Sequence, residues 1–204
     1  MLALVVALCG CENNKSASTP PPDFGNNFTN VVLCIGDSIT QGECVPAGAP
    51  YPARLAALTG KNVINSGICG ERTGATVDRA PGELASDKPA YLCLLIGAND
   101  ALFDYDPNTV GEHIRTIIRV AMAQKTVPLV GTLLPMYGPH GVYGGNATAM
   151  SAVIRTVVAQ EGAVLVDLEA EFGTDETLLQ DDGLHPSDSG NQLIALSFND
   201  KIAH

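Results

Sequence analysis

The sequence predicts an α/β fold in which a parallel sheet lies between two layers of helices. Five short apolar runs recur along the chain, and each is continuous, which is typical of strands buried on both faces. Helical patterns fill the segments between the runs. Strands and helices that alternate with short connections favour a three-layer α/β/α sandwich, with a flavodoxin-like parallel sheet of five strands.

The expected elements follow in order along the chain. The apolar runs place strands at about 31–35, 62–65, 91–96, 127–134 and 163–168. Pro52 and Gly60 bound a first helix, since proline suits a first turn and glycine a left-handed cap. Three apolar stripes at helical spacing indicate further helices: one behind a capping box at Thr109–Glu112, one that stops at Gly162, and one that runs from Ile194 to Ile202.

Length and charge limit the class of protein. A chain of 204 residues suits one domain of this type after a short N-terminal extension. The 22 Asp and Glu residues against 11 Lys and Arg give a net charge of −11. An acidic surface repels phosphate backbones, so we expect no nucleic-acid partner.

The first thirty residues have the pattern of an exported protein. Residues 1–10 have the length and small-residue ending of a lipoprotein-type signal peptide, although no basic residue precedes the apolar stretch. Leu8-Cys9-Gly10-Cys11 resembles a bacterial lipobox, which implies lipidation of Cys11. Residues 11–30 are polar and proline-rich, as in a disordered tether, and 31–204 form the domain. We expect an envelope lipoprotein whose only membrane contact is the anchor, with secretion or a periplasmic location as the alternative.

The substitution Cys11→Ala tests this expectation. If Cys11 carries the lipid, the wild-type protein should partition into the detergent phase and the variant should not.

Three of the expected strands end in clusters of small or polar residues, and a fourth such cluster lies near the C-terminus. The clusters are Gly36-Asp37-Ser38, Asn65-Ser66-Gly67-Ile68-Cys69-Gly70, Gly97-Ala98-Asn99-Asp100 and, near the C-terminus, Asp181-Asp182-Gly183-Leu184-His185-Pro186. Strands of a parallel sheet end at one edge, so Ser38, Gly70 and Asn99 are expected to lie together there. A serine, a histidine with an acid, and two donors for an oxyanion are the components of serine-based acyl transfer.

The order Ser38, Gly70, Asn99 and His185 resembles the four blocks of the SGNH, or GDSL, hydrolase family over roughly residues 31–203. The local sequence around these residues is most similar to that of the bacterial arylesterase/thioesterase/lysophospholipase branch. The resemblance implies that Ser38 is the nucleophile and His185 the base. It favours Asp182 over Asp181 as the acid that orients His185, and Gly70 over Gly67 as an oxyanion donor beside Ser38 and Asn99.

Other residues near these blocks receive structural interpretations. Asp37 and Asp100 are expected to hold loops by accepting backbone hydrogen bonds. His113, His140 and His204 have no acidic partner in the sequence, so no chemical role is assigned to them. Cys34 and Cys93 are expected in the core. Cys44 and Cys69 follow the first two strands, where a disulfide is feasible.

The sequence thus predicts a serine esterase that cleaves small carboxylic esters or thioesters through an acyl-Ser38 intermediate. No cofactor or metal is expected, since no cysteine pair has zinc-site spacing and Asp104–Asn108 lacks key residues of a calcium loop. Two alternatives remain open: a carbohydrate acetyl esterase with the same catalytic residues, and a surface lipoprotein that binds glycans or lipids without catalysis.

Overall fold

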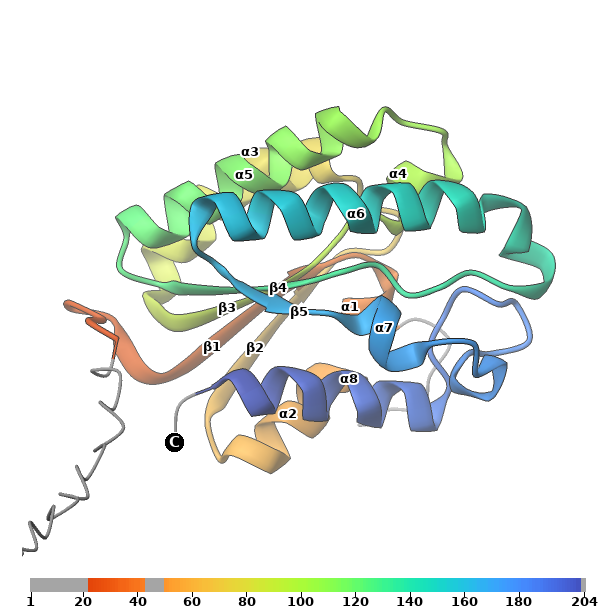
Figure 1. The fold of residues 1–204 in the computed structure, drawn as a ribbon. Coiled ribbons are helices and arrows are strands. Elements are labelled where there is room, and N and C mark those ends of the chain that lie inside the picture. The colour runs from red at the N-terminus through yellow and green to blue at the C-terminus, as the bar shows by residue number, and fades with distance from the viewer. Residues whose placement is uncertain (1–21, 43–49, 203–204) are drawn as a thin grey trace, which may run out of the picture.

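The computed structural model describes residues 22–42 and 50–202, which form a five-stranded sheet between two layers of helices (Figure 1). The strands are β1 (Phe28–Gly36), β2 (Asn62–Gly67), β3 (Pro89–Leu95), β4 (Val127–Gly131) and β5 (Val164–Val166). They pair in the order β2-β1-β3-β4-β5, and every pair is parallel. The three-layer α/β fold expected from the sequence is confirmed.

Helices cover both faces of the sheet. One face carries α3 (Thr73–Asp87), α5 (Pro107–Ala123) and α6 (Gly144–Glu161), and the other carries α2 (Tyr51–Thr59) and α8 (Asp188–Lys201) (Figure 1). The shorter helical turns are α1 (Ser38–Gln41), α4 (Ala98–Leu102), α7 (Leu168–Phe172), η1 (Gly138–Tyr143) and η2 (Glu176–Leu178). Within the described ranges, no helix combines the length and the apolar character needed to cross a bilayer.

The central strands β1, β3 and β4 are buried on both faces, which explains why they are continuous apolar runs. Every residue of β3 is buried, and β1 is buried from Val31 onward. Cys34 and Cys93 pair across β1 and β3 as buried free thiols, as expected of core residues. Cys69 is exposed, whereas Cys44 lies outside the described residues. The Cys44–Cys69 disulfide therefore stays a prediction.

The predicted start of α5 was wrong. Thr109 lies inside the helix, and the cap is Asp106, whose Oδ1 accepts a hydrogen bond of 3.1 Å from the Asn108 N–H. Pro107 occupies the first turn, where a missing N–H costs nothing. The left-handed caps at Gly60 and Gly162 are confirmed, with φ of 67° and 70°.

The first described residues, 22–30, lie in the segment that the sequence assigned to the tether. Strand β1 starts at Phe28, and the side-chain amide of Asn27 lies 3.0 Å from the Pro89 carbonyl oxygen and 2.9 Å from that of Gln124. The proposed tether therefore ends before these residues, because their polar groups are held by the strand and helix ends beside them. Cys11 and the signal peptide lie outside the described residues.

Candidate active site

The register of the sheet brings three of the predicted site residues to one edge. Gly36, the last residue of β1, pairs with Gly67 of β2 and with Leu95 of β3. Ser38, Gly70 and Asn99 follow these three paired residues along the chain, each within four residues. The order β2-β1-β3 also places the reversal of strand order beside β1, which is where ligands bind in open α/β sheets.

Ser38, His185 and Asp182 form one hydrogen-bonded chain. The Ser38 Oγ lies 2.9 Å from the His185 Nε2, and the His185 Nδ1 lies 2.6 Å from the Asp182 Oδ2. Ser38 opens helix α1 directly after Asp37, whereas the other two residues lie between η2 and α8. Such a chain can move a proton from the serine hydroxyl to the imidazole.

The turn around Asp182 explains why this carboxylate faces the histidine. Its Oδ1 accepts hydrogen bonds from the backbone N–H groups of Leu184 and His185, at 2.9 and 3.0 Å. Partial burial raises the pKa of Asp182, but these bonds and the bond from the His185 ring outweigh it, so the pKa lies below its ordinary value. Asp181, the competing acid, is exposed and makes no hydrogen bond to His185.

His140, which the sequence left without a partner, holds this turn from outside. Its Nδ1 lies 2.7 Å from the backbone carbonyl oxygen of Asp182, and the Tyr137 N–H donates to the Gly183 carbonyl at 3.0 Å. At Gly183, φ is 71° and a Cβ would lie 2.0 Å from the Tyr137 carbonyl oxygen, so only glycine fits. His140 therefore makes a structural contact with this turn that the sequence did not indicate, and no chemical role follows from it. His113 also has a partner, because its Nδ1 lies 2.9 Å from the Thr73 Oγ1; His204 lies outside the described residues.

The backbone N–H groups of Ser38 and Gly70 remain free for a substrate. Neither donates a hydrogen bond within the described residues, whereas the Gly67 N–H is engaged by the Asn65 Oδ1 at 3.0 Å. Gly70 has a φ of 74°, which an L side chain rarely adopts. The geometry therefore favours Gly70 over Gly67 as a donor.

The side chain of Asn99 is the third candidate oxyanion donor. One N–H of its side-chain amide donates to the backbone carbonyl of Glu71 at 3.0 Å. An amide nitrogen carries two N–H bonds, and the second has no acceptor among the described residues. Asn99 is thus oriented by the residue next to Gly70 and keeps one donor available.

Two buried carboxylates hold the surrounding loops, as the sequence indicated. The Asp37 Oδ1 accepts from the Ile39 N–H at 3.0 Å, and the Asp100 Oδ2 accepts from the Thr73 N–H at 3.0 Å. Burial raises the pKa of Asp37 to about 7, although the bond from Ile39 and the nearby His185 act in the opposite direction. Asp37 therefore holds a proton over part of the neutral range.

This raised pKa predicts a pH-dependent stability. The folded chain holds the proton until about pH 7, whereas the unfolded chain releases it near 3.8, so stability falls as pH rises between these values. Asp37→Asn cannot ionise and keeps an oxygen for the Ile39 N–H. Urea unfolding should show the variant gaining a few kcal/mol on the wild type between about pH 4.5 and 8, at roughly 1.4 kcal/mol per pKa unit. Parallel pH curves for the two proteins would contradict this origin.

A hydrogen-bonded Ser38–His185–Asp182 triad at this edge of a flavodoxin-like sheet defines the class of SGNH hydrolases. The chain belongs to the GDSL-like lipase/acylhydrolase family, whose profile matches residues 34–193.

Three curated relatives agree with this membership. The chain is 30% identical to the esterase TesA of Pseudomonas aeruginosa, over 76% of this chain and 79% of the relative. It is 27% identical to thioesterase 1/protease 1/lysophospholipase L1 of Escherichia coli, over 81% and 80%. It is 26% identical to an acetylxylan esterase of Geobacillus stearothermophilus, over 82% and 91%. The chain is therefore a carboxylic ester hydrolase of this family.

Proposed function

We propose that the protein hydrolyses small carboxylic esters or thioesters through a covalent acyl intermediate on Ser38. The 2.9 Å contact between the Ser38 Oγ and the His185 Nε2 carries this proposal, because a serine hydroxyl attacks a carbonyl only when a base accepts its proton. The esterase and thioesterase names of two relatives support the substrate class.

In the first half of the proposed reaction, the Ser38 Oγ attacks the carbonyl carbon while its proton passes to His185. Asp182 fixes the ring with Nε2 as the acceptor and stabilises the imidazolium that forms. The negative charge on the former carbonyl oxygen is met by the N–H groups of Ser38 and Gly70 and by the side-chain amide of Asn99. His185 then gives the proton to the departing alcohol or thiol.

In the second half, a water molecule attacks the acyl-Ser38 carbonyl. His185 accepts a proton from this water and returns it to the Ser38 Oγ as the acid leaves. The same donors stabilise the second tetrahedral intermediate, so one arrangement of residues serves both halves. No step requires a metal or a cofactor.

A small cavity lies beside Gly70, and neither Ser38 nor His185 is part of its wall. It has a volume of about 290 Å³ and is lined in part by Gly70, Arg72, Tyr105 and His113. Ligand pockets for drug-sized molecules usually occupy about 300–1,000 Å³, so this one lies at the small end. A larger cavity of about 550 Å³ behind Tyr137 and Gly183 includes none of the candidate oxyanion donors.

A second candidate is removal of acetyl groups from a carbohydrate. The acetylxylan esterase relative favours it, and the same catalytic residues would serve both reactions. In either case a pure binding function is disfavoured, since ligand binding requires no hydrogen-bonded Ser38–His185–Asp182 chain.

A substrate panel tests the proposal. Initial rates for the purified full chain would be compared on p-nitrophenyl acetate and butyrate, a short acyl-coenzyme A and acetylated xylan. Turnover of aryl esters or acyl thioesters with little acetate release from xylan is the expected result. Preferential deacetylation of xylan would support the second candidate, and no turnover of any of these substrates would contradict both.

A further inference from the structure

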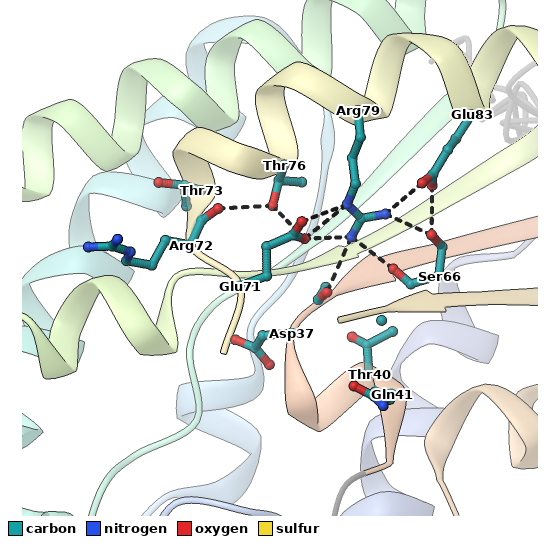
Figure 2. A network of polar contacts seen from close by, with 12 residues as sticks. Asp37, Thr40, Gln41, Ser66, Glu71, Arg72, Thr73, Thr76, Arg79 and Glu83 are labelled. Atoms are coloured by element: carbon teal, nitrogen blue, oxygen red, sulfur yellow. Dashed lines mark hydrogen bonds and ion pairs between the residues drawn. The ribbon is translucent and has the colours of Figure 1, made fainter. Parts of the chain in front are cut away.

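Arg79 of α3 is the centre of a network of hydrogen bonds and ion pairs that includes Ser66, Glu71 and Glu83 (Figure 2). Its Nη2 donates to the Gly36 carbonyl at 3.4 Å and to the Ser66 carbonyl at 2.9 Å. Its Nε donates to both carboxylate oxygens of Glu71, at 2.8 and 3.0 Å, and its Nη1 donates to Glu83 at 2.8 Å. One guanidinium thus links the end of β1, the end of β2 and the loop before α3.

Two of these contacts, those with Gly36 and Glu71, lie within two residues of a candidate oxyanion donor. Gly36 precedes Ser38 by two residues, and Glu71 directly follows Gly70. The Glu71 carbonyl in turn accepts the hydrogen bond from the Asn99 side chain. The segments that carry Ser38 and Gly70 both contact Arg79, and Asn99 is joined to them through the Glu71 carbonyl.

The arrangement is shielded from solvent and geometrically specific. The side chain of Glu71 is 6% exposed and that of Arg79 is 17% exposed. The Thr76 Oγ1 adds a further hydrogen bond of 3.0 Å to the Glu71 Oε2. A planar guanidinium offers five N–H donors in a fixed fork, which a lysine ammonium cannot reproduce.

We propose that Arg79 is a positioning residue that fixes the three oxyanion donors relative to one another. This rests on the proposed acyl transfer at Ser38. Donors stabilise a transition state only when they already point at the developing charge, and misplacement by about 1 Å can cost on the order of 10²-fold in rate. Arg79 touches no reacting atom, so its effect passes through Gly36, Ser66 and Glu71.

The first test is Arg79→Lys, which keeps the positive charge and loses the fork. We expect kcat to fall by roughly tenfold or more while KM changes little, because the lost geometry matters most in the transition state. Arg115→Lys is the matched control. The Arg115 side chain is also 17% exposed and pairs with two glutamates, Glu112 and Glu161, but neither contacts a site residue. The Arg115→Lys variant should lose stability and keep the kcat of the wild type.

A double-mutant cycle with Asn99→Ala separates positioning from plain stabilisation. Asn99→Ala alone should lower kcat by roughly 10²-fold, as expected when one oxyanion donor is removed. If Arg79 acts through the donors, Arg79→Lys should cost much less in the Asn99→Ala background than in the wild type. Should Arg79→Lys not fold, Glu71→Gln replaces it in the cycle, since it removes the same ion pair and keeps the side-chain shape.

The outcomes separate this proposal from the proposed function. The role of Arg79 would be overturned, and the proposed function left standing, by either of two results. One is a folded Arg79→Lys variant with the kcat of the wild type. The other is a double variant in which the fold-losses of kcat from Arg79→Lys and Asn99→Ala simply multiply. A fluorophosphonate that fails to label Ser38 in the wild type would instead overturn the acyl-serine mechanism. Circular dichroism confirms that each variant compared is folded.

Discussion

Ser38→Ala is expected to abolish ester hydrolysis while the fold stays intact. The substitution removes the attacking atom, and losses of this kind are of order 10⁴–10⁶ in kcat. Among the described residues, the Ser38 Oγ forms a side-chain hydrogen bond only with His185, so its loss should disturb the fold little. Steady-state hydrolysis of an aryl ester measures the loss, and thermal unfolding reports on the fold.

Covalent labelling gives the same prediction an independent readout. A fluorophosphonate should modify the wild type at Ser38, located by peptide mass spectrometry, and leave Ser38→Ala unmodified. Ser86→Ala is a suitable control, because within the described part of the chain the Ser86 hydroxyl donates only to the Glu83 carbonyl and the Asp87 carboxylate on α3. Full activity in Ser38→Ala, or labelling at another residue, would remove Ser38 from the mechanism.

Asp182→Asn should lower kcat by roughly 10⁴-fold with little change in stability. The asparagine Oδ1 can still accept from the N–H groups of Leu184 and His185, so the turn keeps its shape. Its amide nitrogen would then face the His185 Nδ1 as a donor. The ring would have to carry its proton on Nε2, where it could no longer accept the proton of Ser38.

Asp181→Asn is the matched control for this substitution. It makes the same chemical change one residue away, at an exposed carboxylate with no hydrogen bond to His185. Its kcat should equal that of the wild type within about twofold, since exposed charges contribute little. If the two variants lost activity equally, the effect would come from net charge near the site, and Asp182 would have no special role.

Strands β1, β3 and β4 could be predicted from the sequence because each is buried along most of its length, whereas the edge strands β2 and β5 are mostly half-buried. Helix α3 is different: its buried positions include Thr73 and Thr76, so no apolar stripe marks it, and Pro81 lies inside it. Hydrophobic periodicity has no signal to detect in such a helix. The start of α5 was misplaced because two capping patterns overlap, and Asp106 with Pro107 prevailed over Thr109.

The site residues with a motif could be named from the sequence, whereas their supports could not. Ser38, Gly70, Asn99 and His185 follow strand ends or a turn in a fixed order. Arg79 and His140 act on backbone carbonyls and carboxylates of distant segments, and nothing in the local sequence specifies such partners. Only the folded arrangement brings these groups together.

Strand β1 places the entry of the chain and the candidate nucleophile at opposite ends of the sheet. The chain enters beside Asn27, whose side chain is held at the start of the strand, and Ser38 follows the opposite end. Nine residues at about 3.3 Å each separate these points by roughly 30 Å. If the chain is attached to a surface through its N-terminus, the length of β1 adds to the reach of the tether. The catalytic edge could then meet substrates that lie farther from the surface than the point where the chain enters the domain.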